Sequence, residues 1–164
     1  MTMNSVHINV FNEGGIMERF IKLEFQKGGA FKAKMLDNLA PKTCRVIYES
    51  LPFSSGALNG SFSGYVFYLM KGFDFHELEN PVVFGAQPGD IFLNTNANCS
   101  VFEGKILPPR IVVAYNSSVI LQNWAGYTPS NLFAKIVDAD MQKFYQVGKR
   151  IRWEGREEIT FSAL

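Results

Sequence analysis

An alternation of apolar and charged residues near the start most constrains how this chain can fold. In residues 20–25 (Phe-Ile-Lys-Leu-Glu-Phe) the second, fourth and sixth side chains are apolar and those between them are charged. This period of two is typical of a strand with one buried face. The glycines of Gln26-Lys27-Gly28-Gly29 suit a turn, and residues 31–35 repeat the alternation. The pattern predicts an antiparallel hairpin.

The period then changes to that of a helix. Pro41 suits a first helical turn, Pro52 cannot continue a helix, and between them apolar side chains recur at helical spacing, namely Cys44, Ile47, Tyr48 and Leu51. We expect a helix over residues 41–51 that packs this stripe against one end of a barrel. A second helix is predicted over 140–147, with Asp138 or Asp140 as its N-cap and Gly148 at its end.

Short strands separated by turn residues fill most of the remaining chain. Apolar runs bounded by Gly, Pro and Asn predict strands at residues 65–70, 82–84, 91–93, 101–103, 111–115, 119–121, 132–137, 151–153 and 159–161. The stretch 54–64 is rich in Ser and Gly and predicts no strand. Many short strands with two short helices indicate a mainly β, closed or nearly closed barrel. We expect one domain over 1–164, with 1–15 as a polar lead-in.

Composition excludes several classes of protein. With 47% hydrophobic residues and a net charge of +1, the 164-residue chain is neither disordered nor basic enough for a nucleic-acid binder. We see no signal peptide and no run of 18 apolar residues, so we expect no membrane partner and a cytoplasmic location. Two cysteines make no disulfide framework, and no Cys/His cluster has metal-ligand spacing. We expect no metal and no cofactor.

Several short motifs resemble the cyclophilins. Residues 39–43 (Leu-Ala-Pro-Lys-Thr) resemble the start of the first cyclophilin helix, and Gln87-Pro88-Gly89-Asp90 resembles the cyclophilin Gln-Gly-Gly-Asp turn. The whole order is more similar to an uncharacterised bacterial family of cyclophilin-like proteins. The shared order consists of Ala-Pro-Lys-Thr, Leu51-Pro52-Phe53, Ser63-Gly64, Glu79-Asn80, Pro88-Gly89-Asp90, Asn131 with Phe133-Ala134, and Trp153-Glu154-Gly155. The resemblance covers residues 20–161 and implies a cyclophilin-like closed β-barrel with two short capping helices.

Two departures bear on activity. Cyclophilin isomerases carry a Phe-His-Arg segment whose arginine polarises the prolyl amide, and residues 61–70 here contain neither Arg nor His. Gln87 cannot replace a guanidinium, because arginine supplies a permanent charge and a planar fork of donors. The similar proteins often carry a His where this chain has Leu132. Prolyl isomerisation is therefore disfavoured.

The candidate catalytic residues lie in the acidic, aromatic stretch 73–81. His76 stands among carboxylates that could hold its imidazole basic and oriented for acid–base work. The alternative is a solvated loop with ordinary surface charges. The resemblance places Glu79 and Asn80 at the barrel mouth. We predict Glu79 or His76 as the acid–base group and Asn80 as a ligand contact.

The remaining candidates are an amide and three aromatic rings. Asn131 is part of the shared motif. Trp124 stands in a polar stretch, where a large aromatic ring is unusual. Tyr115 and Tyr65 flank apolar strands. Together they describe a generic small-molecule site, although the rings could instead seal the barrel ends.

These residues favour the binding of a small polar metabolite in a pocket at the barrel mouth, with its chemical transformation left open. The main alternative is a binding or assembly module without chemistry, and peptidyl-prolyl isomerisation ranks third. The sequence leaves the oligomeric state open, with a homo-oligomer among the options.

Overall fold

The alternating segment forms the expected hairpin. In the computed structural model, which describes residues 10–11, 17–95, 101–102 and 105–164, β3 (Phe20–Phe25) pairs antiparallel with β4 (Ala30–Met35). Ile21 and Leu23 are fully buried, as the period of two requires. The turn places Gly28 and Gly29 at positive φ, a conformation that glycine adopts without steric cost.

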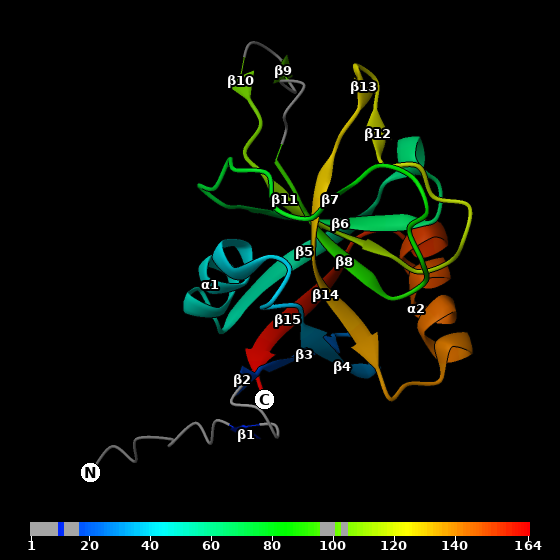
Figure 1. The fold of residues 1–164 in the computed structure, drawn as a ribbon. Helices are drawn as coiled ribbons and strands as arrows, with labels where there is room; N and C mark the ends of the chain where they lie inside the picture. The colour runs from blue at the N-terminus through cyan, green and yellow to red at the C-terminus, as the bar shows by residue number, and fades with distance from the viewer. Residues whose placement is uncertain (1–9, 12–16, 96–100, 103–104) are drawn as a thin grey trace.

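Eight antiparallel strands close into a barrel (Figure 1). From β4 and β3 the order continues through β15 (Glu157–Ala163), β5 (Phe53–Asn59), β6 (Val66–Gly72), β11 (Arg110–Ala114), β8 (Asp90–Asn94) and β14 (Ser130–Val137). The barrel closes because β14 pairs back onto β4. The predicted class is confirmed: a mainly β, closed barrel with two helices, consistent with a cyclophilin-like barrel.

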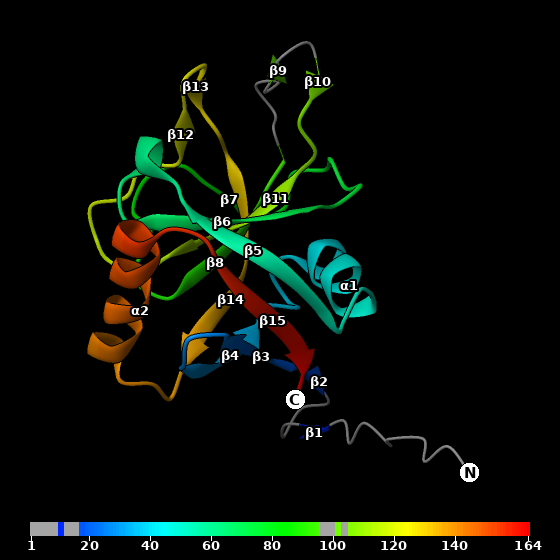
Figure 2. The same cartoon turned by 180° about the vertical axis from the view of Figure 1, so that it is seen from behind.

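The two helices lie on opposite sides of the barrel (Figures 1 and 2). The helix α1 (Pro41–Glu49) buries Cys44 and Ile47 completely, and Tyr48 and Leu51 pack beside them. The predicted apolar stripe is confirmed. The helix α2 (Met141–Glu154) begins as expected at Asp140, whose carboxylate accepts hydrogen bonds from the backbone N–H groups of the first turn.

The predicted end of α2 is wrong, and so is the strand predicted at 151–153. The helix continues through Gly148 to Glu154 and ends at Gly155, which has a φ of 91°. Gly148 is needed inside the helix because a Cβ there would overlap the ring of Tyr115. The glycine therefore allows close helix–barrel packing and does not end the helix.

Other strand predictions need smaller corrections. The Ser/Gly-rich stretch contains β5, which pairs on both edges, and a 3₁₀ turn, η1 (Ser61–Ser63), follows it. No strand forms at 119–121; the next residues form β12 (Gln122–Asn123), which pairs with β13 (Gly126–Tyr127). The strand predicted at 82–84 is the two-residue β7 (Pro81–Val82). The remaining pairs are β1 (Val10–Phe11) with β2 (Met17–Glu18), and β9 (Val101–Phe102) with β10 (Lys105–Ile106).

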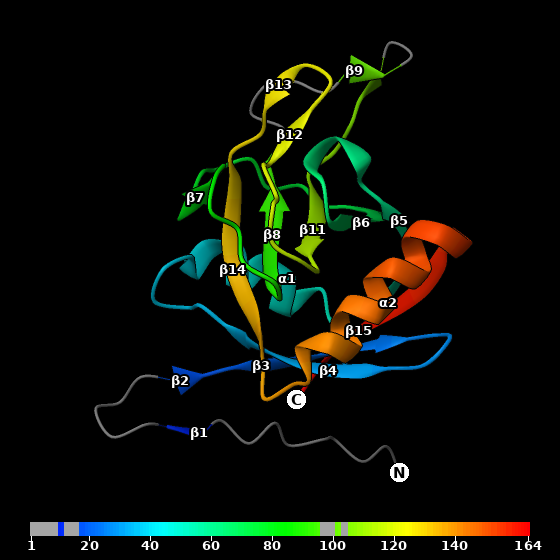
Figure 3. The ribbon, with the colours of Figure 1, turned by 90° about the vertical axis from the view of Figure 1, so that its right-hand side faces the viewer.

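One wall of the barrel is buried on both faces. In β11 the side chains alternate, so that Ile111 and Val113 belong to the core inside the barrel while Val112 and Ala114 belong to a second cluster outside it. Val119 and Leu121, from the segment before β12, join this outer cluster. Figure 3 shows β14, β8 and β11 side by side in this wall. The outer face of the wall therefore carries its own layer of structure.

Candidate functional site

Glu79 meets the first turn of α1. The first N–H groups of a helix have no partner within the helix, and the N-cap residue Ala40 has no side-chain acceptor. Glu79, from a loop distant in sequence, supplies the missing acceptor. Its Oε1 accepts from Thr43 N at 2.6 Å and from Thr43 Oγ1 at 2.8 Å, and its Oε2 accepts from Lys42 N at 3.2 Å. A carboxylate there also complements the positive end of the helix dipole.

Asn131 holds the same loop from inside the fold. This fully buried side chain on β14 accepts from Glu79 N at 2.9 Å and donates to the Glu77 carbonyl at 2.8 Å and to Thr43 Oγ1 at 3.2 Å. We call Glu79, Asn131 and Thr43 the capping network. The structure brings Glu79 and Asn131 together, and their polar atoms bind the chain itself. Their ligand role stays a prediction.

Asn80 adds a further link between the loop and β14. Its backbone has a φ of 49°, which asparagine tolerates better than most residues. Its Nδ2 donates to the Leu132 carbonyl at 2.9 Å, while its own carbonyl accepts from Leu132 N at 3.1 Å. The ligand contact predicted for Asn80 is likewise a prediction still.

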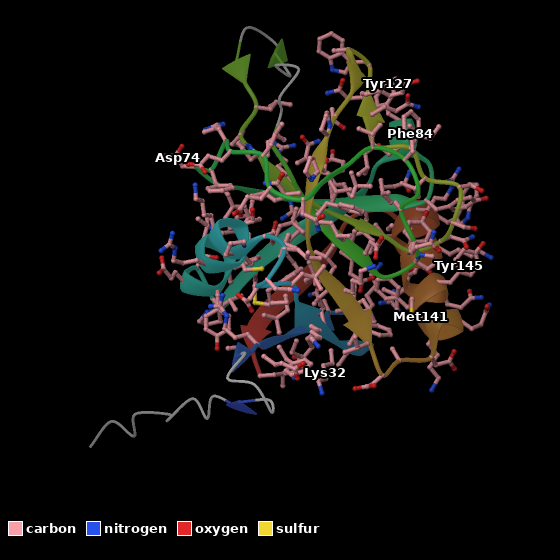
Figure 4. All side chains as sticks on the ribbon, in the orientation of Figure 1. Lys32, Asp74, Phe84, Tyr127, Met141 and Tyr145 are labelled. Carbon is pink, nitrogen blue, oxygen red and sulfur yellow. The ribbon has the colours of Figure 1, made fainter. Side chains whose placement is uncertain are left out.

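His76 is exposed. Its Nε2 lies 3.2 Å from Asp74 Oδ1, and both side chains are largely open to solvent. In Figure 4, Asp74 projects at the outer edge of the molecule. Next to it, Glu77 pairs with Lys42 at 2.6 Å, and this hydrogen bond raises the pKa of Lys42. The surroundings of His76 match the alternative of a solvated loop, and its acid–base role is untested.

Tyr65 and Tyr115 pack between the barrel and α2. Tyr115 is 1% exposed, its hydroxyl lies 3.4 Å from Asn59 Oδ1, and burial raises its pKa. The ring of Tyr65 meets that of Tyr115 edge to face, with 5.9 Å between centroids, and Tyr145 of α2 lies next to both. Figure 4 shows Tyr145 on that helix. Both predicted rings thus fill the helix–barrel contact.

Trp124 lines a different site. This residue is 59% exposed and borders a cavity of about 210 Å³ on the outer face of β6 and β11. The outward side chains Val66, Tyr68 and Val112 form its floor. The cavity therefore lies against the outer wall, and the pocket that we expected at the barrel mouth stays a prediction.

The rim combines apolar groups and amides. Phe62, Leu107 and Pro108 supply apolar surface, and Asn94, Gln122 and Asn123 supply amide groups.

Part of the rim is fixed in place by hydrogen bonds. Gln122 Nε2 donates to the Phe62 carbonyl at 3.0 Å, and Ser63 Oγ bonds both to the carbonyl of Gln122 at 2.8 Å and to its N–H at 3.1 Å. These bonds attach η1 to β12, so this part of the rim is held without a ligand.

Arg110 gives this cavity its charge. Its guanidinium lies 5.7 Å from the centroid of the Tyr68 ring, within reach of a cation–π contact. The buried Nε has no hydrogen-bond partner among the described residues, and leaving a buried donor unpaired costs ~1–3 kcal/mol. We call this hollow the Arg110 cavity. Arg110 was not predicted from the sequence; the one signal was a charged residue directly before the apolar run 111–115.

No metal centre or membrane helix emerges from the described part of the chain. Within it, no group of three or more His, Cys, Asp or Glu side chains could hold a metal ion. None of the helices there has the length and apolar character needed to cross a membrane.

The comparisons with known proteins identify a family. Residues 23–163 match the family described as "Protein of unknown function (DUF3830)". The chain belongs to this family. The expectation of an uncharacterised family is thereby confirmed for DUF3830, and the comparison with curated proteins gave no match.

Two solved structures share the fold of this DUF3830 chain. The structure of McbB in complex with tryptophan is 17% identical with a TM-score of 0.64, covering 87% of this chain and 44% of McbB. This chain thus spans less than half of the length of McbB. The solution structure of the hypothetical protein AF2241 from Archaeoglobus fulgidus is 17% identical with a TM-score of 0.56, covering 88% of this chain and 94% of AF2241. At these identities the likeness concerns the fold alone.

Proposed function

We propose that this DUF3830 chain binds a small polar metabolite in the Arg110 cavity. The observation that carries the proposal is a partly preformed hollow with an apolar floor, amides on its rim and one buried donor that the described chain leaves unpaired. Ligand sites in proteins combine a mostly apolar lining with a few placed polar groups in this way.

Two further observations support the proposal. The rim carries Trp124, an exposed ring that could cover the flat face of a ligand. McbB, 44% of which matches this fold, was solved in complex with tryptophan, which is a small molecule.

Binding without chemistry is the form of the proposal that this cavity favours. Its described lining residues include no Asp, Glu or His that could move a proton. An acid–base role for Glu79 or His76 would need a ligand elsewhere, at the α1 loop. The two versions can be separated by asking which residues a bound metabolite depends on.

A thermal-shift screen against small metabolites tests the proposal, with Trp124→Ala and Trp153→Ala as matched variants. Trp153 is 74% exposed on α2 and does not line the cavity. A ligand that raises the Tm of the wild type should lose at least half of that shift in Trp124→Ala and keep it in Trp153→Ala. The proposal is wrong if no metabolite shifts the wild-type Tm, or if both variants respond like the wild type.

A further inference from the structure

The chemistry of Arg110 narrows the class of ligand. We infer that the Arg110 cavity takes a small organic carboxylate with a flat apolar body, and that the Arg110 guanidinium pairs with its carboxylate group. This inference rests on the proposed function, because it names the ligand of the same cavity.

The first argument is charge. Among the described residues that line the cavity, Arg110 is the one charged group. Three other arginines are matched within the fold, since Arg19, Arg150 and Arg156 each pair with a carboxylate. Arg110 has no such partner in the part of the chain that the structure describes. An uncompensated cation in a partly desolvated hollow favours an anionic ligand.

The second argument is the unpaired donor itself. The Tyr68 ring lies near the guanidinium, and the buried Nε–H is left without an acceptor. Hydrogen bonds from a guanidinium lie in its plane, where Nε and one terminal nitrogen form a fork. A carboxylate fits such a fork with two parallel hydrogen bonds. A carboxylate is therefore the acceptor that best suits an arginine with a free Nε–H.

The third argument is the rest of the lining. Val66, Val112 and Pro108 offer apolar surface, and the rings of Phe62 and Trp124 border the same space. A volume of about 210 Å³ is below the ~300–1,000 Å³ typical of pockets for drug-sized ligands, so the body of the ligand is small. One arginine without a lysine among the described lining residues suits a carboxylate monoanion better than a phosphate dianion, which needs more donors.

Isothermal titration with matched probes tests the inference on the full chain. The probes are phenylacetate, its neutral counterpart phenylacetamide, and inorganic phosphate. We expect phenylacetate to bind the wild type about tenfold or more tightly than phenylacetamide, because charge-assisted hydrogen bonds are the stronger ones. Arg110→Gln should remove that preference, and Arg110→Lys, which keeps the charge without the fork, should retain part of it. Arg45→Gln is the control, because Arg45 is exposed on α1 and does not line the cavity.

Each outcome decides between the two proposals. Equal binding of phenylacetate and phenylacetamide to the wild type would overturn the carboxylate assignment. If a metabolite raises the Tm of the wild type and this shift is lost in Trp124→Ala, the proposed function stands. Tighter binding of phosphate than of phenylacetate would also overturn the assignment. If no probe binds the wild type, the inference is wrong, and the metabolite screen judges the proposed function separately. Should Arg110→Gln fail to fold, the wild-type preference and Arg110→Lys still give the answer.

Discussion

The capping network and the Arg110 cavity differ in whether their buried polar groups have hydrogen-bond partners within the chain. In the network, the oxygens of Glu79 and the amide of Asn131 reach partners within the chain. In the cavity, the buried Nε of Arg110 finds none among the described residues. Buried polar groups that find hydrogen-bond partners within the chain hold the fold together. A buried polar group that the chain leaves unpaired needs a partner from outside the chain, such as a ligand or a water molecule. We propose that this difference separates a structural centre from a binding site.

Asn131→Ala should give the largest effect that this comparison predicts. It removes the acceptor for Glu79 N and the donor to the Glu77 carbonyl inside the fold. We expect a loss of about 2–4 kcal/mol in the free energy of unfolding, because buried polar groups are left without partners. Urea unfolding measures it. A loss below about 0.5 kcal/mol, the size of an ordinary surface substitution, would show that the network is not structural.

Glu79→Ala should cost less, about 1–2 kcal/mol, which is the usual range for the loss of an N-terminal helix cap. Glu79→Gln keeps an acceptor and removes the charge, so it should cost about half as much. Glu77→Gln is the matched control, since its exposed pair with Lys42 contributes little to stability. Equal unfolding curves for Glu79→Ala and Glu77→Gln would contradict the capping role.

Cys44 follows Thr43 of the capping network on α1 and gives a smaller effect on the free energy of unfolding, one that depends on pH. Burial raises the pKa of this thiol to about 12, and its Sγ lies 3.3 Å from the Phe133 carbonyl. A pKa raised by folding gives stability that is complete below the pKa of the unfolded thiol and is lost as pH rises toward 12. Between pH 7.5 and 9.5 the wild type should lose about 1 kcal/mol more than Cys44→Ala, measured by urea unfolding at both values. Parallel losses would place the thiol in contact with solvent.

The fold was largely predictable because local patterns agree with it. The alternation in β3 and β4, the apolar stripe of α1 and the Asp140 cap are each set by neighbours in the chain. Gly148 was misread because its reason is the ring of Tyr115, which is distant in sequence. The strand β5 was missed because pairing on both edges, rather than its Ser- and Gly-rich side chains, makes it a strand.

The candidate site was less predictable. Glu79 and Asn131 were each predicted from the sequence as site residues, but the sequence could not show that Thr43 and a helix terminus would take up their hydrogen bonds. Trp124 was selected because a large ring in a polar stretch is unusual, and it lines the cavity. The one local signal for Arg110 is its charge directly before the apolar run 111–115, because an unpaired donor is a property of the folded surroundings.

A single thermal-shift experiment tests the central distinction most directly. The Tm of the wild type, Glu79→Gln and Arg110→Gln is measured with and without phenylacetate. Glu79→Gln should melt below the wild type and keep the full ligand-induced shift, whereas Arg110→Gln should melt near the wild type and lose most of the shift. A shift that is lost in Glu79→Gln and kept in Arg110→Gln would contradict the account and place the ligand at the α1 loop.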